Sequence, residues 1–270
     1  MNSLKNTLEI WRFSSSGVNL RDRIISFFCA RYGNISRKRK FLRGILYLLI
    51  GSSGRGGQIS IAFHISGKIY HILLRKGNSA DYLVFGEMVM GGYTLKDNIS
   101  AHIFEIHDGG ANIGLFSIYA HAKFPKADLT CYEPDEGNIS QLRLNLKANQ
   151  ILAKVIPKAL WSKSADLYFH PRESYSGFVS EEKSSYPISC LCPSILNNSW
   201  LKLDIEGAEY EVLPSLFHVG YKPEIISIEI HDFRRRGGQL LELLSVNGYI
   251  WEESFDPKED CIALTVYKKH

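Results

Sequence analysis

Short apolar runs typical of strands alternate with helix-like segments through most of the chain, and this alternation restricts the fold more than any other feature. The strand-like runs lie at 103–107, 129–133, 154–156, 201–204 and 225–230. Between most of them apolar residues recur at helical spacing, as in Ile139, Leu142 and Leu146. Such alternation predicts right-handed crossovers and a parallel sheet covered on both faces. The last run, 262–267, follows no helical pattern, so we expect it to enter the sheet antiparallel.

The first 55 residues differ from the rest of the chain in charge. They hold eleven Lys or Arg residues and two acidic ones, whereas the whole chain carries a formal charge of only +4. We therefore predict a basic helical extension at 1–55 and a mildly acidic domain at 56–270, which opens with a β-hairpin at 58–76. This distribution favours an anionic partner for the extension and argues against nucleic acid as a substrate of the body.

Residues 37–50 join a basic cluster to an apolar run that is too short for a bilayer, which needs about 20 residues. Two interpretations stay open: an amphipathic helix in peripheral contact with a membrane, or a helix packed on the body, which we favour. Apolar residues make up 45% of the chain, which excludes a disordered or collagen-like protein. Five scattered cysteines exclude a disulfide framework, so we expect a reducing, cytoplasmic compartment.

A glycine-rich segment, Asp-Gly-Gly-Ala-Asn-Ile-Gly at 108–114, follows the first strand-like run. In α/β sheets of this kind, ligands bind outside the carboxyl ends of the strands. Gly110 and Gly114 permit a tight turn and a close backbone approach, and Asn112 tolerates a left-handed backbone. Asp108 would repel the phosphates of a dinucleotide but suits a cationic ammonium and sulfonium. The segment therefore favours S-adenosyl-L-methionine as the cofactor.

Glu133 ends the second run, nineteen residues after Gly114. An acidic side chain at this place accepts both hydrogen bonds of a ribose diol. The alternative is a structural role as the cap of the following helix. Because the glycine-rich segment independently predicts a ribose acceptor here, we favour the cofactor role.

Three carboxylates, Asp204, Glu206 and Glu209, follow the fourth run. Unpartnered buried carboxylates are costly, so we expect Asp204 to point into a cleft. Glu206 and Glu209 also suit the first turn of a helix, where the helix dipole favours acids.

The fifth run ends in Glu-Ile-His-Asp at 229–232, and the strand period of two places Glu229 and His231 on one side. A histidine beside acids at a strand end is a candidate general base, with a structural histidine as the alternative. We predict that His231 removes a proton from the acceptor and that Asp204 orients His231 or the acceptor. In a second version, Asp204, Glu206 and Glu229 collect a divalent metal ion that acidifies the acceptor hydroxyl.

Together these motifs resemble the FkbM-type S-adenosylmethionine-dependent methyltransferases. The matching segments are 108–114, 132–135 with Asn138, 159–160, 201–209 and 228–231. The resemblance covers roughly residues 80–267. It implies an α/β, Rossmann-like, seven-stranded methyltransferase sheet, mostly parallel with the last strand antiparallel. The N-terminal helical and hairpin extension precedes this sheet, and the resemblance does not cover residues 1–55. It also implies an enzyme that methylates a hydroxyl of a sugar, a glycan or another small metabolite.

Carried over residue by residue, the resemblance implies that Asp108, Gly110, Asn112 and Gly114 hold the methionine part of the cofactor and that Glu133 holds the ribose. We add Ala159, Asp204 and Glu87, the last of which matches a family glutamate that reaches the same pocket. Two positions depart from the family pattern. Gly109 stands where an aliphatic residue is usual, and Trp161-Ser162 stands where Ser-Asp is common.

Two other functions compete with this interpretation. A dinucleotide-dependent oxidoreductase is disfavoured by Asp108 and Asn112. A non-catalytic binding module that keeps the methyltransferase fold and associates with a membrane is disfavoured by the acidic cluster, because a protein released from catalysis has no physical reason to retain several uncompensated carboxylates around one cleft. The segment 174–193 carries no strand period or motif, so we expect it to form loops around an acceptor pocket. Nothing in the sequence specifies the acceptor or the oligomeric state.

Overall fold

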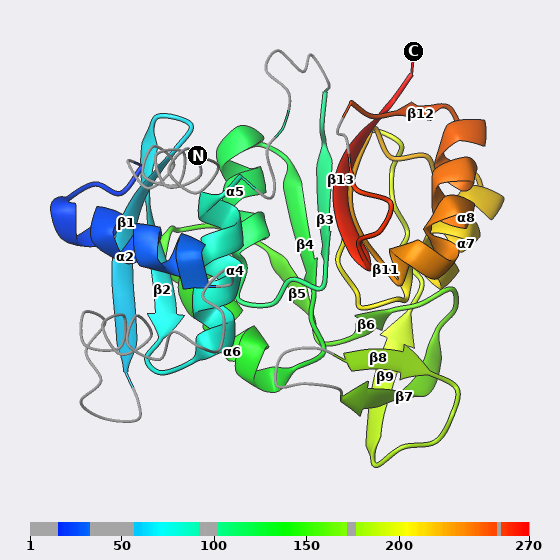
Figure 1. Cartoon of the computed structure of the whole chain (residues 1–270), viewed down its shortest axis with the longest axis horizontal. Helices are drawn as coiled ribbons and strands as arrows, with labels where there is room; N and C mark the ends of the chain where they lie inside the picture. The colour runs from blue at the N-terminus through cyan, green and yellow to red at the C-terminus, as the bar shows by residue number, and fades with distance from the viewer. Residues whose placement is uncertain are drawn as a thin grey trace. The chain divides into compact units, whose positions relative to one another are not determined.

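The computed structural model describes residues 16–32, 57–91, 95, 102–171, 177–252 and 255–269. The chain divides into two compact units (Figure 1). The first comprises 1–93, 113–123 and 140–152, and the second comprises 94–112, 124–139 and 153–270. The segment 37–50, for which a membrane contact is predicted, lies outside the described residues, and the domain boundary at residue 55 stays a prediction.

The predicted hairpin is confirmed in the first unit. Strands β1 (Gln58–Ile65) and β2 (Lys68–Arg75) pair antiparallel over their whole length. Ser66 and Gly67 between them both have positive φ, at 50° and 77°, as a two-residue type I′ turn requires. Alternate residues of both strands are buried, because the period of two turns them to one face.

Among the described residues, four helices or parts of helices complete the first unit. They are α2 (Leu20–Tyr32), α4 (Ser79–Val89), α5 (Leu115–Lys123) and most of α6 (Glu136–Ala148). Helices α2 and α4 cross closely at Gly86, where a Cβ atom would collide with the carbonyl oxygen of Cys29. Glycine is therefore required at this crossing.

Amide side chains of α6 and the residue just after it bind the edge of β2. Asn145 accepts the N–H of Leu73 at 2.7 Å and donates to its carbonyl at 3.1 Å. Asn149 makes the same pair of bonds with His71, at 2.7 and 2.8 Å. Gln141 donates to the carbonyl of Leu73 at 2.6 Å. Residues four apart share one helix face, so these side chains form a continuous amide ladder along the strand.

The second unit is built on a sheet of seven strands, which confirms the predicted α/β architecture. The strands are β12 (Tyr249–Ile250), β13 (Cys261–Lys268), β11 (Ile225–His231), β10 (Ser199–Leu203), β3 (Glu105–Gly109), β4 (Asp128–Tyr132) and β5 (Lys154–Ile156), in that order across the sheet. Strands β11, β10, β3, β4 and β5 run parallel, and β13 pairs antiparallel with β11 and β12. The expected antiparallel entry of the last strand is therefore confirmed.

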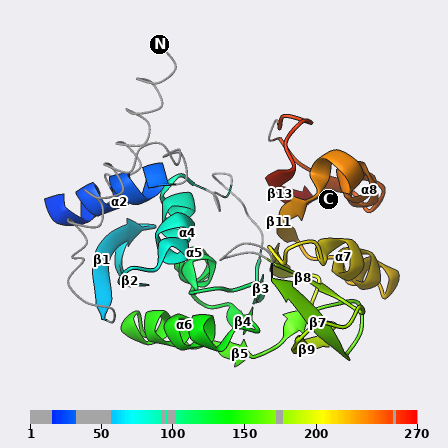
Figure 2. The same cartoon turned by 60° about the horizontal axis from the view of Figure 1, so that its bottom comes forward.

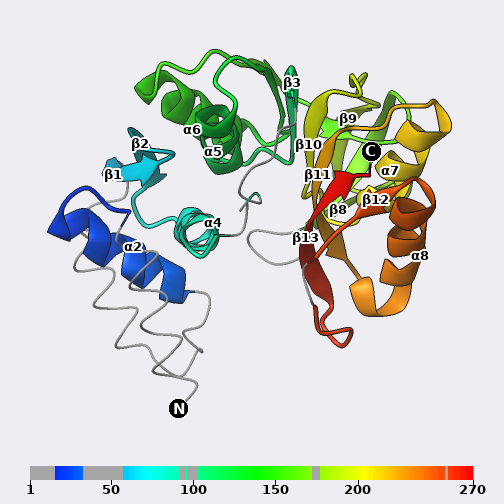
Figure 3. The ribbon, with the colours of Figure 1, turned by 90° about the horizontal axis from the view of Figure 1, so that it is seen from above.

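Helices α7 (Glu209–His218) and α8 (Phe233–Val246) lie side by side on one face of this sheet (Figure 3). Their apolar residues, among them Leu213, Leu216 and Leu240, share a buried core with Ile226 and Ile228 of β11. This packing fixes the carboxyl ends of β10 and β11, from which the two helices follow.

A second sheet corrects the expectation of loops at 174–193. Strands β6 (Ala159–Leu160), β9 (Tyr186–Leu191), β7 (Ala165–Pro171) and β8 (Gly177–Ser180) form it in that order. Figure 2 shows β7, β8 and β9 together. Its buried apolar cluster consists of Ala159, Leu167 and Cys190 among the described residues. So small a core leaves little apolar period in the sequence, which is why the sheet was missed. Among the described helices, none is long and apolar enough to cross a bilayer.

Candidate functional site

Backbone strain marks the carboxyl ends of three neighbouring strands in the second unit. Asn112 follows β3, Glu206 follows β10 and Asp232 follows β11, and their φ angles are 50°, 57° and 52°. A left-handed backbone costs a non-glycine residue about 1–2 kcal/mol, somewhat less for Asn and Asp. Such strain persists where the surrounding structure demands it and gathers at functional sites. These strand ends are therefore the place to look for a site, as the sequence predicts.

The loop after β3 passes directly against the end of β10. A Cβ atom on Gly110, whose φ is 72°, would overlap the carbonyl oxygen of Asp204. Asp108, at the end of β3, is buried. Gly114 belongs to the first unit, where its φ of 86° and its close approach to Leu142 of α6 require glycine. The structure thus gives Gly114 a packing role, and its cofactor contact stays a prediction.

Glu133 connects the ends of β3 and β4. Its carboxylate accepts the N–H of Asn112 at 2.8 Å and that of Asp135 at 2.9 Å, and only 6% of the residue is exposed. Burial raises the pKa of Glu133, while the two N–H groups act in the opposite direction. Asp135 accepts the N–H of Asn138 and caps α6. The alternative role of Glu133 as this helix cap is therefore wrong.

Two further predicted cofactor residues belong to other elements. Ala159 is buried in β6 of the second sheet. Glu87 lies on α4 of the first unit with an exposed side chain. Their cofactor contacts stay predictions.

Lys202 of β10 is a site residue that sequence reasoning missed. Only 4% of it is exposed, and its Nζ lies 3.6 Å from Asp108 Oδ1 and 3.3 Å from Asp204 Oδ2. It also donates to the carbonyl oxygen of Gly110 at 2.8 Å. Burial opposes ionisation of Asp204, but the charges of Lys202 and His231 prevail and lower its pKa. The sequence feature that could have identified Lys202 is its position between two leucines of a buried strand, where an unpaired charge is costly.

His231, at the end of β11, lies between two carboxylates from the segment after β10. Its Nδ1 is 2.9 Å from Glu209 Oε1, and its Nε2 is 3.4 Å from Glu206 Oε2. Glu209 is fully buried and also accepts the N–H of Ile205 at 3.1 Å. The sequence left Glu209 open between a helix-dipole acid and a site residue, and the structure places it against the candidate base.

The surroundings of His231 favour its protonated form. Burial lowers the pKa of His231, but contacts with Cys261 and with the buried Glu209 carboxylate outweigh this effect and raise the pKa well above its ordinary value. His231 therefore holds a proton near neutral pH when no ligand is bound. Its role as a base stays a prediction, and it requires a bound ligand that lowers this pKa.

The predicted metal ligands fall into two overlapping groups. Ligand atoms of Asp204, Glu206 and His231 lie within 4.8 Å of one another, and so do those of Glu229, His231 and Cys261. The prediction combined Asp204, Glu206 and Glu229. The structure places His231 in both groups and adds Cys261, which sequence reasoning did not consider.

The strain at Glu206 can be measured. The free energy of unfolding should be about 0.5–1 kcal/mol higher for Glu206→Gly than for Glu206→Ala. Glycine adopts positive φ without a steric penalty, although it loses more chain entropy on folding. Glu206→Ala removes the same carboxylate and keeps the strain, so it serves as the matched control. Urea unfolding of the two variants gives the comparison. If Glu206→Gly is less stable than Glu206→Ala, the backbone at this position carries no such strain.

A comparison with models of protein families identifies the family of the region that contains these strand ends. The family model of the methyltransferase FkbM domain matches residues 108–251, just over half of the chain. The chain belongs to the FkbM methyltransferase family. The matched region includes every predicted site residue except Glu87.

The FkbM relatives share only part of their length with this chain. It is 38% identical over 84 residues to methyltransferase sdnD of Sordaria araneosa, which covers 29% of the chain and 32% of that protein. It is 24% identical over 143 residues to methyltransferase 1 of Beauveria bassiana (strain ARSEF 2860), which covers 41% of the chain and 57% of that protein. The chain thus spans about a third and just over half of these relatives. A solved FkbM methyltransferase from Methylobacillus flagellatus KT aligns with 98% of the chain and 60% of its own length, at 13% identity and a TM-score of 0.43.

Proposed function

We propose that this FkbM family member is an S-adenosyl-L-methionine-dependent enzyme that methylates a hydroxyl oxygen of a sugar, a glycan or another small metabolite. The observation that carries the proposal is the position of Glu133. Its buried carboxylate binds the backbone of the glycine-rich loop after β3 from the end of the neighbouring strand, inside the region that matches the family. A ribose acceptor is expected at this place in a sheet of this kind.

The described residues around Glu133 fit this cofactor. The carboxylate accepts the backbone N–H groups of Asn112 and Asp135 and a side-chain bond from Asn138, which leaves part of its roughly four lone-pair directions for a ribose hydroxyl. Asp108 and Asp204 contribute negative charge suited to an ammonium and a sulfonium, and Lys202 balances part of it. We assign the following residues to the cofactor: Asp108, Gly110, Asn112, Gly114, Glu133, Ala159, Asp204 and Glu87.

When bound, this cofactor supplies a methyl group on a positively charged sulfur that is already a good leaving group. The protein then has to align the acceptor hydroxyl, exclude water and take up the hydroxyl proton. We assign the proton uptake to Nε2 of His231 and the orientation of His231 or the acceptor to Asp204. A positive charge nearby lowers the pKa of a histidine. A cationic ligand would therefore counteract Glu209 and favour the neutral imidazole that a base requires.

Calorimetry with S-adenosyl-L-methionine and S-adenosyl-L-homocysteine on the full chain tests the cofactor assignment. We expect binding in the micromolar range. The transferred group is then followed with a ¹³C-methyl-labelled cofactor and a panel of sugars, glycans and small alcohols. The ¹³C NMR chemical shift of the transferred methyl group distinguishes O-methyl products from N- and C-methyl products. A folded chain that binds neither compound contradicts the proposal, and a product methylated on nitrogen or carbon contradicts its oxygen specificity.

A further inference from the structure

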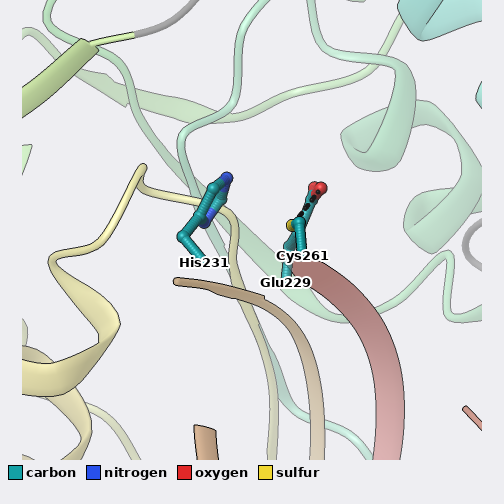
Figure 4. A group of neighbouring side chains, drawn as sticks. All are labelled: Glu229, His231 and Cys261. Carbon is teal, nitrogen blue, oxygen red and sulfur yellow. Dashed lines mark hydrogen bonds between the residues drawn. The ribbon is translucent and has the colours of Figure 1, made fainter. Parts of the chain in front are cut away.

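We propose that Glu229, His231 and Cys261 form a binding site for a divalent cation of borderline softness, with Zn²⁺ as the best match. Each residue offers one ligand atom, and the three atoms lie within 4.8 Å of one another. Figure 4 shows the three side chains standing together at the ends of β11 and β13. No metal site is needed for the function proposed above, so this inference goes beyond it.

The pairing of β11 with β13 brings the three residues together. His231 lies directly opposite Cys261 in the antiparallel pair, and Glu229 precedes His231 by two residues on the same strand. Directly opposed residues, and residues two apart, project from the same face of a sheet. The ligands therefore start from two hydrogen-bonded strands, which hold a site more precisely than loops do.

The donor set matches the preferences of zinc. Zn²⁺ binds thiolate, imidazole nitrogen and carboxylate oxygen, and sites with three protein ligands keep a fourth position for water or substrate. The Cys261 thiol now donates to Glu229 Oε1 at 3.0 Å. On binding, the S–H bond of Cys261 and the Nε2–H bond of His231 break, and both protons pass to the solvent. The thiolate, the imidazole nitrogen and the carboxylate then each donate an electron pair to the cation.

Glu209 supplies the support that a metal-binding histidine usually has. Metal-bound histidines commonly donate their other ring nitrogen to a carboxylate, which fixes the orientation of the ring. Nδ1 of His231 contacts the fully buried Glu209 carboxylate at 2.9 Å, so a cation would bind Nε2 and replace that nitrogen's contact with Glu206 Oε2 at 3.4 Å. Glu209 Oε2 is buried and has no hydrogen-bond partner among the described residues. Glu209 thus acts through His231 and not as a ligand.

Local charge and donor type distinguish the group of Glu229, His231 and Cys261 from the group of Asp204, Glu206 and His231. Asp204 and Glu206 also have ligand atoms near His231. However, the Lys202 ammonium already lies 3.3 Å from Asp204 and balances charge on that side. The Glu229 group also offers the thiol of Cys261, a softer donor that suits Zn²⁺ better than the second carboxylate of the Asp204 group does. We therefore assign the cation to the Glu229 side of His231.

A cation at this position would have a catalytic use if the proposed function is correct. It would sit at the carboxyl end of β11 and occupy Nε2 of His231, so it would replace proton uptake by that nitrogen. Its fourth position could instead bind the acceptor hydroxyl and lower the pKa of that hydroxyl. This role rests on the proposed function, whereas cation binding does not.

Titration of the chelator-treated full chain with Co²⁺, without cofactor, tests the site. A Co²⁺–thiolate bond gives a charge-transfer band in the near ultraviolet, which a carboxylate-only site lacks. We expect this band at one ion per chain, and we expect Zn²⁺ to abolish it by competition. Cys261→Ser should remove the band. Cys192→Ser is the matched control, because Cys192 is the other partly exposed cysteine among the described residues, and it should retain the band.

Two further variants define the site. Glu206→Gln should retain the band, and Glu209→Gln should weaken Zn²⁺ binding by about 10- to 100-fold, the range typical for residues that orient a metal ligand. A folded wild-type chain without the band overturns the proposal, and so does a band that persists in Cys261→Ser. If Co²⁺ binds without giving the band, and Glu206→Gln abolishes this binding, the ion lies on the Asp204 side. That result also overturns the proposal. Because binding is measured without cofactor, these outcomes do not depend on methyl transfer.

Discussion

Replacing His231 with Ala lowers the turnover number by about 10²- to 10⁴-fold and leaves the affinity for S-adenosyl-L-methionine unchanged. This range is typical for the loss of a group that transfers a proton in the transition state. The reason is that His231 stands at the end of β11, against Glu206 and Glu209, and is not a predicted cofactor contact. Steady-state kinetics with a saturating acceptor, together with calorimetry for the cofactor, gives both quantities.

His218 provides the control for this substitution. It lies at the end of α7 with an exposed side chain, so His218→Ala should leave turnover unchanged. Equal loss of turnover and of cofactor affinity in His231→Ala would contradict the role as a base. A chelator separates the two chemical roles of His231. Turnover that survives the chelator assigns the loss to proton transfer, and turnover that disappears with it assigns the loss to a bound cation.

The second large effect concerns Glu133. Replacing Glu133 with Gln should weaken cofactor binding by about 10- to 100-fold, because hydrogen bonds to a charged group contribute about 1.5–3 kcal/mol. Gln keeps the shape of the side chain but offers an N–H to one of the two backbone donors at Asn112 and Asp135. Calorimetry measures the affinity, and thermal unfolding shows whether the loop survives the substitution.

Glu133 also predicts the direction of a pH effect. Burial raises the pKa of this carboxyl group. The ionised form accepts the ribose hydrogen bonds, so cofactor affinity should fall as the pH decreases through the raised pKa. In Glu133→Gln the affinity should be low throughout and lack this dependence. Asp135→Asn is the control, since Asn remains a good cap for α6. An affinity that rises on acidification would place the ribose elsewhere.

The sheet and the order of its motifs could be predicted because their signals are local. Buried parallel strands read as short apolar runs, and the residues that follow them stand at one edge of the sheet. This reasoning placed Asp108, Asp204 and His231 at neighbouring strand ends. It also placed Glu133 beside the glycine-rich loop. The hydrogen bond from the N–H of Asn112 to the Glu133 carboxylate holds the two together.

The residues that were missed depend on pairing, which the sequence does not display. Cys261 faces His231 only because β13 runs antiparallel to β11 in one register. Lys202 looks like an irregularity in an apolar run until Asp108 and Asp204 are placed on either side of it. Glu209 was left open, because it suits the first turn of a helix as well as it suits a histidine partner. The deciding partner is distant in sequence in each case: His231 for Cys261 and Glu209, and Asp108 for Lys202.

The amide ladder between α6 and β2 places a constraint on insertions and deletions. Four helical residues rise about 6.0 Å, whereas two strand residues span about 6.6–6.8 Å, so the two spacings agree for only a few steps. Asn145 and Asn149 meet Leu73 and His71, and the longer Gln141 reaches back to Leu73. Deleting one residue between Asn145 and Asn149 would rotate one amide by about 100° away from the strand. The backbone groups of β2 would then be open to a strand from another chain. The spacing of these amides should therefore tolerate length changes less well than the surface loops do.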